Sequence, residues 1–278
     1  MVNNMSFDSE LKKYLEDKHN YKKLGLSIEE LNGDFKYHLN ENELLSTAST
    51  MKLFVLGALL KKCERGEEDL NRLVTLKKEN FYPGSGVLSY LSEGIKLTVK
   101  DLMTLMIILS DNSATNLCID LVGGVNNVNE HIKECHVENA TLNRKVYDRS
   151  PNPEKKKLAE VSAKAFTDYL RVIRNTDYFT KEYKDLFFKI LSNQQFKDMF
   201  GRYLPLKDFY DDGEIELMSK TGYDGGVRVD VGLIVLNDDR EYAYALMING
   251  AEDGSYSFDN KTHHMMAEIG KLFYDSIK

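Results

Sequence analysis

The 278-residue chain has no tryptophan, only four prolines and only three cysteines. Cys63, Cys118 and Cys135 are odd in number and lack C-x-x-C spacing, so we expect neither a disulfide framework nor a zinc site. Two of them, Cys63 and Cys118, stand in apolar helical contexts that are typical of a protein core. His263 and His264 are adjacent near the C-terminus and have no third ligand at metal-binding spacing. The sequence therefore predicts no metal and no cofactor.

Long hydrophobic runs and clusters of positive charge are missing as well. The longest apolar stretches, residues 53–60 and 102–109, are too short to cross a bilayer. The net charge is −7 and no basic cluster exceeds the EKKK of residues 154–157, so nucleic acid is not an expected partner. The first residues contain no basic segment followed by an apolar one. We therefore expect a monomeric cytoplasmic protein, or a secreted one if a leader was removed from the natural chain.

Periodic apolar residues predict the elements of the N-terminal part. Residues 6–19 follow a helical period, and residues 23–31 and 34–42 read as two strands joined at Asn32-Gly33, a strong hairpin signal. Residues 50–63 are apolar nearly all round, which predicts a helix in the centre of the protein. Ser49 stands where this helix would take its N-cap.

The rest of the chain changes character once. Residues from about 60 to 200 follow helical patterns, whereas three turn-separated strands and a final helix follow Leu206. The sequence predicts an α+β fold in which residues 1–45 and 205–278 form an antiparallel sheet flanked by terminal helices. Residues 46–204 are expected to form an all-helical domain, with the active site at the interface.

Three short motifs stand in one order along the chain: Ser49-Thr50-Met51-Lys52, Ser110-Asp111-Asn112 and Lys220-Thr221-Gly222. The first is weak by itself, because S-x-x-K occurs again at Ser9–Lys12 in a polar stretch. The other two occur once each. The contexts also fit chemistry, since the motifs fall at the start of a buried helix, the end of an apolar helix and the end of a strand.

The motifs and their surroundings resemble the class A β-lactamases and the other penicillin-recognising serine hydrolases. Residues 83–129 resemble the helical domain of that family throughout, and residues 142–144 resemble the start of its Ω-loop. The likeness covers roughly residues 20–278. It implies the β-lactamase/transpeptidase-like fold and a serine hydrolase that acts through an acyl-serine intermediate.

The chemistry of the first motif follows from residue types and spacing. A serine hydroxyl is a poor nucleophile until a base takes its proton, and positions i and i+3 share one helix face, which places Lys52 beside Ser49. A lysine acts as a base only if burial or a neighbouring cation lowers its pKa. The apolar helix supplies burial and Lys220 the cation. Ser110 would relay a proton to the leaving nitrogen.

Further roles rest on the resemblance alone. It implies that the backbone N–H groups of Ser49 and Tyr223 form an oxyanion hole, and that Asn112 binds the substrate's side-chain amide. Thr221 and Gly222 belong to the implied substrate-binding strand. Arg228 would bind a substrate carboxylate, with a surface arginine as the alternative.

The sequence departs from the class A pattern at one catalytic position. That family carries a glutamate two residues beyond the Ω-loop arginine, and counting from Arg144 this position is Val146. An alignment through Asp148-Arg149 would place Pro151 there instead. Neither is a carboxylate, so we expect slow deacylation unless Asp148, Glu154 or Lys52 substitutes as the base.

Several functions remain open on these grounds. The first is hydrolysis of a β-lactam, amide or ester through acyl-Ser49, and the second is a penicillin-binding sensor that acylates without turnover. A D-Ala-D-Ala peptidase fits the missing glutamate but not the missing leader, because its substrate lies outside the membrane. Structural alternatives also stay open: Ser49 as a helix cap, Ser110-Asp111-Asn112 as a helix-end turn, and Lys220-Thr221-Gly222 as a plain strand end.

Overall fold

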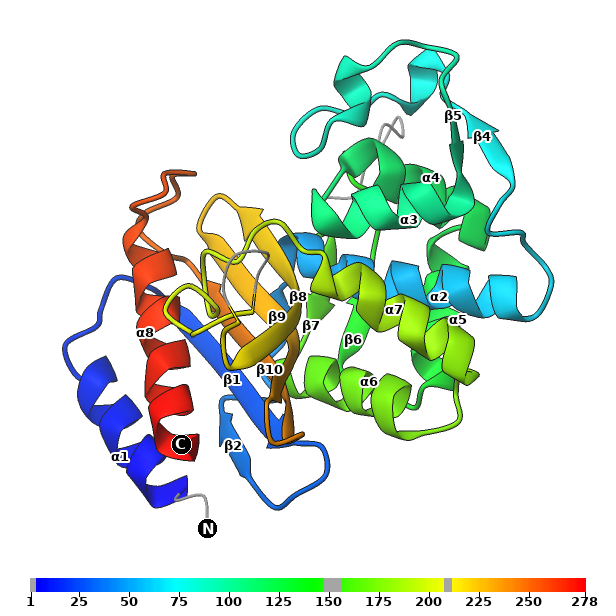
Figure 1. The fold of residues 1–278 in the computed structure, drawn as a ribbon. Coiled ribbons are helices and arrows are strands. Elements are labelled where there is room, and N and C mark those ends of the chain that lie inside the picture. Colours follow the sequence, from blue (N-terminus) through cyan, green and yellow to red (C-terminus); the bar gives the residue numbers. More distant parts are fainter. Residues whose placement is uncertain (1–3, 148–156, 208–211) are drawn as a thin grey trace.

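A computed structural model describes residues 4–147, 157–207 and 212–278 of the chain. Within these ranges, no helix is both long and apolar enough to span a membrane. The fold is α+β, as the sequence predicts, and Figure 1 shows a sheet packed beside a group of helices.

The sheet has five antiparallel strands in the order β2-β1-β10-β9-β8. Their bounds are Lys23–Glu30 (β1), Lys36–Leu39 (β2), Ile215–Asp224 (β8), Val227–Leu236 (β9) and Glu241–Asn249 (β10). The predicted hairpin at Asn32-Gly33 is confirmed, because β1 and β2 pair across it. The Lys220-Thr221-Gly222 motif lies inside β8 rather than at its end, because pairing with β9 continues to Asp224.

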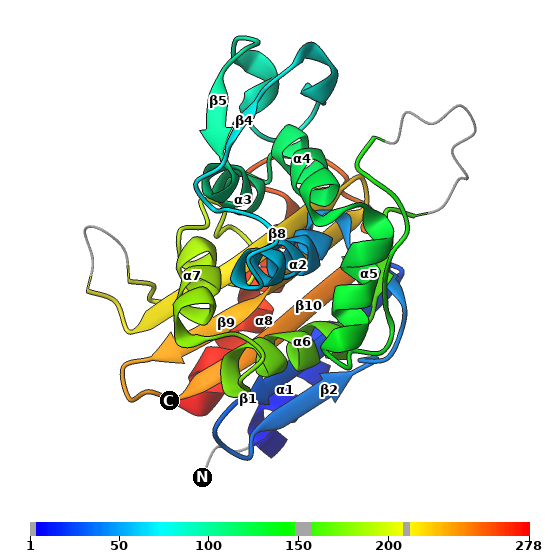
Figure 2. The same ribbon diagram turned by 90° about the vertical axis from the view of Figure 1, so that its right-hand side faces the viewer.

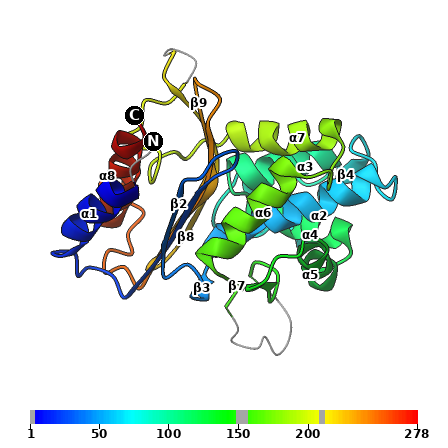
Figure 3. The same cartoon turned by 90° about the horizontal axis from the view of Figure 1, so that it is seen from below.

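The two terminal helices cover one face of this sheet. Helix α1 spans Asn4–Leu15 and α8 spans Lys261–Ile277, and they contact each other behind the strands (Figure 3). Phe7, Tyr242 and Phe273 meet there edge to face in a separate apolar core. The predicted antiparallel sheet flanked by terminal helices is therefore confirmed.

The other face of the sheet carries the middle of the chain. Its helices are α2 (Lys52–Glu64), α3 (Val99–Ile108), α4 (Asn112–Val122), α5 (Val125–Glu134), α6 (Ala163–Asn175) and α7 (Lys181–Ser192). Helix α6 packs on β1 and β10, and Figure 2 shows α2 at the centre of the group, against α4, α5 and α7.

This part of the chain is not purely helical. Short strands pair as β3-β7-β6 and as β4-β5, with bounds Leu45–Ser46 (β3), Leu73–Thr75 (β4), Lys96–Thr98 (β5), Ala140–Leu142 (β6) and Ala159–Val161 (β7). Two 3₁₀ turns, Lys78–Asn80 (η2) and Leu88–Tyr90 (η3), lie between β4 and β5. The all-helical expectation missed these strands because two or three residues are too few to show an alternating pattern.

Helix α2 begins later than the sequence suggested. A 3₁₀ turn, η1, spans Ala48–Met51, and α2 starts at Lys52. Thr47 takes the N-cap position of η1, so the expectation that Ser49 is an N-cap is wrong. The residues from Lys52 to Leu60 are all buried, as predicted for a central helix.

Candidate active site

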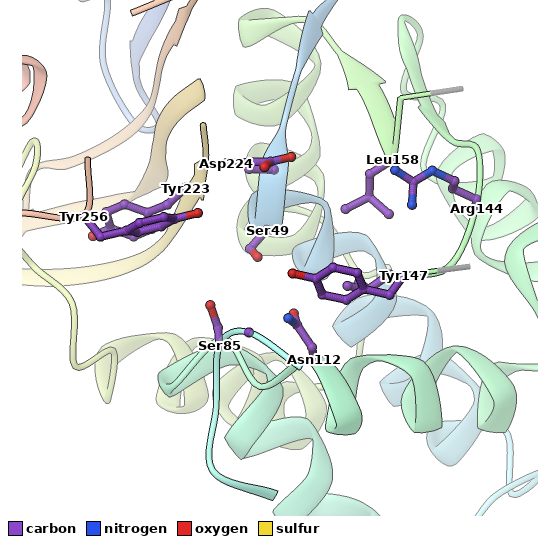
Figure 4. A pocket seen from close by; sticks show the side chains of 12 residues that line it. Ser49, Ser85, Asn112, Arg144, Tyr147, Leu158, Tyr223, Asp224 and Tyr256 are labelled. Atoms are coloured by element: carbon purple, nitrogen blue, oxygen red, sulfur yellow. The ribbon is translucent and has the colours of Figure 1, made fainter. Parts of the chain in front are cut away.

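A cavity of about 550 Å³ opens beside Ser49, between the end of β8 and the helical part of the chain. Its walls come from segments that are far apart in the sequence (Figure 4). The lining residues are Ala48, Ser49, Gly84, Ser85, Asn112, Arg144, Val146, Tyr147, Leu158, Tyr223, Asp224 and Tyr256. Ser49 is partly exposed. It lies between Tyr223 and Tyr256 on one side and Tyr147 on the other (Figure 4).

Strand β8 approaches the backbone of Ser49 closely at Gly222. A Cβ on Gly222 would lie 2.6 Å from the Thr47 carbonyl oxygen and 3.1 Å from the Ser49 nitrogen, so only glycine fits without a shift. Tyr223 is the next residue on the strand. The backbone N–H groups of Ser49 and Tyr223 therefore belong to segments in direct contact.

Lys52 brings the first two motifs together. Its side chain is fully buried, and Nζ donates to the Ser110 carbonyl oxygen at 2.6 Å, to Ser110 Oγ at 3.0 Å and to Asn112 Oδ1 at 3.2 Å. Burial lowers the pKa of Lys52 well below its usual value, and the positive charge of Lys220 lowers it further. Among the described residues, Lys52 makes no hydrogen bond to the Ser49 hydroxyl, although Lys52 follows Ser49 by one turn.

The Ser110-Asp111-Asn112 turn joins α3 to α4 in an unusual backbone conformation. Ser110 has φ +56°, in the left-handed region, and this places both its hydroxyl and its carbonyl on Lys52. Asp111 accepts from the Ala114 N–H at 2.9 Å as the N-cap of α4, and from Val87 and Leu88 N–H at 2.7 and 2.8 Å. Asp111 is thus structural, whereas the turn presents Ser110 to Lys52.

Asn112 begins α4 and reaches the cavity. Its Oδ1 accepts from Lys52, and its Nδ2 donates to the Pro83 carbonyl oxygen at 2.9 Å. These two bonds orient the side-chain amide at the cavity wall, where Figure 4 labels it below Ser49.

Lys220 lies inside β8 and is fully buried. Its Nζ donates to the Thr221 carbonyl oxygen at 2.7 Å. Burial lowers its pKa to about 7, against the opposing effect of the Asp230 carboxylate. Thr221 is buried beside it, so the third motif supplies a titratable cation beneath the cavity rather than an exposed one.

Arg228 is fully buried, so the surface-arginine alternative is wrong. Its Nε donates to His263 Nε2 at 2.9 Å, and its terminal nitrogens donate to the carbonyl oxygens of Gly225, Val227 and Ser255. The structure therefore places this guanidinium in a network of its own, behind the cavity wall. His263 is a buried structural partner there, as the sequence predicts, and the described residues form no group that could hold a metal ion.

Sequence reasoning missed several residues of the cavity wall. Tyr147, Tyr256 and Leu158 lie on irregular segments, where no period marks a residue that faces a site. Tyr147 has φ +47°, and in Figure 4 its hydroxyl is directed toward the Ser49 side of the cavity. The signal was absent from the sequence because single aromatic residues in loops are common.

Val146, at which the count from Arg144 places the class A glutamate position, lines the cavity. It is 8% exposed and lines the same wall as Arg144. Asn116 of α4 holds its backbone through two hydrogen bonds, from Asn116 Nδ2 to the Val146 oxygen at 2.8 Å and from the Val146 nitrogen to Asn116 Oδ1 at 3.0 Å. Asp148, Arg149, Pro151 and Glu154 lie outside the described residues.

Comparison with known proteins places this arrangement in a family. The model of the "Beta-lactamase enzyme family" matches residues 6–277. The chain is 27% identical over 256 residues to beta-lactamase BRO-1 of Moraxella catarrhalis, covering 91% of this chain and 79% of that protein.

Two solved structures share the fold over nearly their whole length. A beta-lactamase from Sphaerobacter thermophilus has a TM-score of 0.84 at 25% identity, covering 99% of this chain and 98% of that one. A mutant of PBP-A, solved as an acyl-enzyme complex with penicillin G, has a TM-score of 0.83 at 20% identity, covering 98% and 96%. The family match spans nearly all of the chain, so the protein belongs to the beta-lactamase enzyme family, with the fold of its class A serine enzymes.

Proposed function

We propose that the protein is a serine hydrolase that is acylated at Ser49 by a β-lactam or a related amide or ester. The observation that carries this proposal is the buried Lys52 amine, which bonds to Ser110 and Asn112 one turn from Ser49 at the cavity. A lysine with a lowered pKa beside a serine is the arrangement that nucleophilic catalysis requires.

Acylation then uses Ser49, Lys52 and Ser110 together with the backbone of Tyr223. Neutral Lys52 takes the proton of the Ser49 hydroxyl, and Oγ attacks the substrate's carbonyl carbon. The backbone N–H groups of Ser49 and Tyr223 stabilise the oxyanion that forms. Ser110, hydrogen-bonded to Lys52, passes a proton to the leaving nitrogen or oxygen as its bond to carbon breaks. The product is an ester on Ser49.

Substrate contacts are assigned to three neighbours of Ser49. Asn112 holds the side-chain amide of the substrate from the cavity wall, and Thr221 and Gly222 supply the edge of β8 along which the substrate lies. Arg228 is assigned no direct substrate contact, because four partners already accept its hydrogen bonds.

Deacylation is proposed to be slow. Removal of the acyl group needs a base to activate water, and such a base is worth roughly 10²–10⁴ in rate, or about 3–5 kcal/mol. The position that corresponds to the class A glutamate carries the apolar Val146, and Asn116 forms two hydrogen bonds to the Val146 backbone. This observation favours a second candidate function, a penicillin-binding protein or sensor whose acyl-enzyme persists. A D-Ala-D-Ala peptidase would use the same acylation chemistry.

Intact-protein mass spectrometry separates these functions. The protein is mixed with penicillin G or with a chromogenic cephalosporin, and the adduct mass and substrate loss are followed together. A covalent adduct that is absent in Ser49→Ala and kept in Ser9→Ala, which alters the duplicate S-x-x-K motif, supports acylation at Ser49. Fast turnover without an accumulating adduct supports an efficient β-lactamase and contradicts slow deacylation. No adduct and no turnover of any β-lactam or ester would overturn the proposed function.

A further inference from the structure

A hydrogen-bonded network behind the cavity connects three distant segments. Asp198 follows α7, Tyr223 ends β8, and His263 lies in the first turn of α8. The Tyr223 hydroxyl donates to Asp198 Oδ1, and His263 Nδ1 lies 3.0 Å from Asp198 Oδ2. One carboxylate therefore ties the end of the Lys-Thr-Gly strand to the C-terminal helix.

The direction of the bonds in this network follows from Arg228. A guanidinium nitrogen can only donate, and Arg228 Nε lies 2.9 Å from His263 Nε2. His263 Nε2 therefore carries no proton, and the proton of the neutral ring is on Nδ1, facing Asp198. Arg228, His263 and Asp198 thus form a row of polar contacts that ends on the carboxylate.

The network contacts both strands of the β8–β9 hairpin. Tyr223 and Arg228 are directly paired partners on β8 and β9. The Tyr223 ring packs against His263, with centroids 5.2 Å apart at 64°, and the Arg228 guanidinium lies 5.8 Å from the Tyr223 ring centroid. The side chain of Tyr223 is thus held by its hydroxyl, by its ring and through its strand partner.

The charge of Asp198 fits this role. Burial raises its pKa, but the hydrogen bonds from His263 and Tyr223 outweigh that effect, and the net pKa is lowered. The group is therefore an anion that accepts a hydrogen bond from Tyr223 and lies 3.0 Å from His263 Nδ1. Charge-assisted bonds of this kind are stronger and shorter than neutral ones, which suits a fixed geometry.

We propose that Asp198 and His263 are positioning residues, which hold the Tyr223 backbone N–H in place to receive the oxyanion. The proposal rests on acylation at Ser49 as proposed above. It assigns a function to the tyrosine side chain that follows the Lys-Thr-Gly motif. If the Tyr223 side chain is released from Asp198, the peptide plane of Tyr223 can rotate. Its backbone N–H then no longer points toward the oxyanion, while the rest of the cavity stays unchanged.

Two variants that act on the hydrogen bond between Tyr223 and Asp198 test this. Tyr223→Phe deletes the hydroxyl, and Asp198→Asn keeps the shape of the side chain while removing its charge. The matched control is Tyr37→Phe, which deletes a tyrosine–aspartate bond of 3.1 Å to Asp8, away from the cavity. The measurements are the acylation rate constant and the noncovalent Kd for penicillin G, the affinity for phenylboronic acid, and Tm. Phenylboronic acid forms a tetrahedral adduct on serine that places an oxygen in the oxyanion site.

Complete loss of one oxyanion donor costs roughly 10²–10³ in rate, so a misaimed donor is expected to cost about tenfold. We expect Tyr223→Phe and Asp198→Asn each to slow acylation by about tenfold and to weaken the binding of phenylboronic acid by about tenfold. The Kd for penicillin G should be unchanged. The double variant should be no slower than either single variant, because both changes break the same bond. Tyr37→Phe should acylate at the wild-type rate.

The outcomes separate this proposal from the one on which it rests. Wild-type protein that forms no Ser49 adduct overturns the proposed function, and the positioning role with it. If Tyr223→Phe acylates at the wild-type rate, the positioning role alone is overturned, whether or not Asp198→Asn folds. The same follows if Kd and the acylation rate change together, since a merely structural bond would affect both.

Discussion

Lys52 Nζ lies 3.0 Å from Ser110 Oγ and 2.6 Å from the carbonyl oxygen of the same residue. The two residues are 58 positions apart, and the left-handed backbone at Ser110 directs both oxygens to the amine. A fully buried lysine normally carries a large desolvation penalty, which three acceptors reduce here. The contact joins the first two motifs in the proposed proton path.

Replacement of Lys52 by methionine is the first test of that path. Methionine fills the buried volume but cannot accept a proton, so we expect the rate of Ser49 acylation to fall by roughly 10²–10⁴. Lys62→Met is the control on the same helix, because Lys62 donates to the Leu121 carbonyl oxygen at 2.8 Å, outside the cavity. Stopped-flow acylation with a chromogenic cephalosporin measures both. Equal rates in the two variants would remove Lys52 from the mechanism.

The pH dependence of acylation should report Lys220. Its pKa is lowered to about 7 by burial, so it is a cation below that pH and neutral above it. The Lys220 charge contributes to the lowered pKa of Lys52, so its loss raises that pKa again, and we expect acylation to slow as the pH rises through about 7. Lys220→Arg keeps its charge at every pH in this range and should lose this high-pH decrease, even if its absolute rate is lower. A wild-type rate that stays level from pH 6 to 9 contradicts a role for the Lys220 charge.

Val146 offers a test of slow deacylation. Val146→Glu places a carboxylate on the cavity wall at a backbone position that Asn116 holds in place, and it should shorten the lifetime of the acyl-enzyme by roughly 10²-fold. Val146→Gln has nearly the same shape without the basic group, so its adduct should persist as in the wild type. Decay of the adduct mass after removal of excess penicillin G gives both lifetimes. If glutamine and glutamate shorten the lifetime equally, the effect is one of shape and the missing base is not the cause.

Asp111 should matter for stability through the loop that it holds. Its carboxylate accepts from Ala114, Val87 and Leu88 N–H while it is almost completely buried. Asp111→Ala leaves three donors unpaired and should lower the free energy of unfolding by about 2–4 kcal/mol. Asp101→Ala, at the exposed capping box of α3, should cost about 1 kcal/mol or less. Urea denaturation measures both, and a small effect at Asp111 would show that water readily replaces its bonds.

Much of the fold could be predicted from the sequence because its signals are local. Alternation around Asn32-Gly33 and the apolar stretch after Met51 specify a hairpin and a buried helix through neighbouring residues alone. The absence of a carboxylate at Val146 was also visible, since it needed only a count from Arg144. Very short strands such as β6 escaped because their pairing partners, not their own residues, make them strands.

What the sequence by itself determined is which reactive groups are present, in which order, and on which kind of element each stands. Only the tertiary structure decided their contacts: Lys52 bonds to Ser110 rather than to Ser49, Ser49 lies in a 3₁₀ turn, and Arg228 is buried against His263. The physical reason is that the contacts of Lys52 with Ser110 and of Arg228 with His263 join residues 58 and 35 positions apart. Periodicity and spacing reach a few residues along the chain, whereas the packing of α2, β8 and α8 sets which side chains meet.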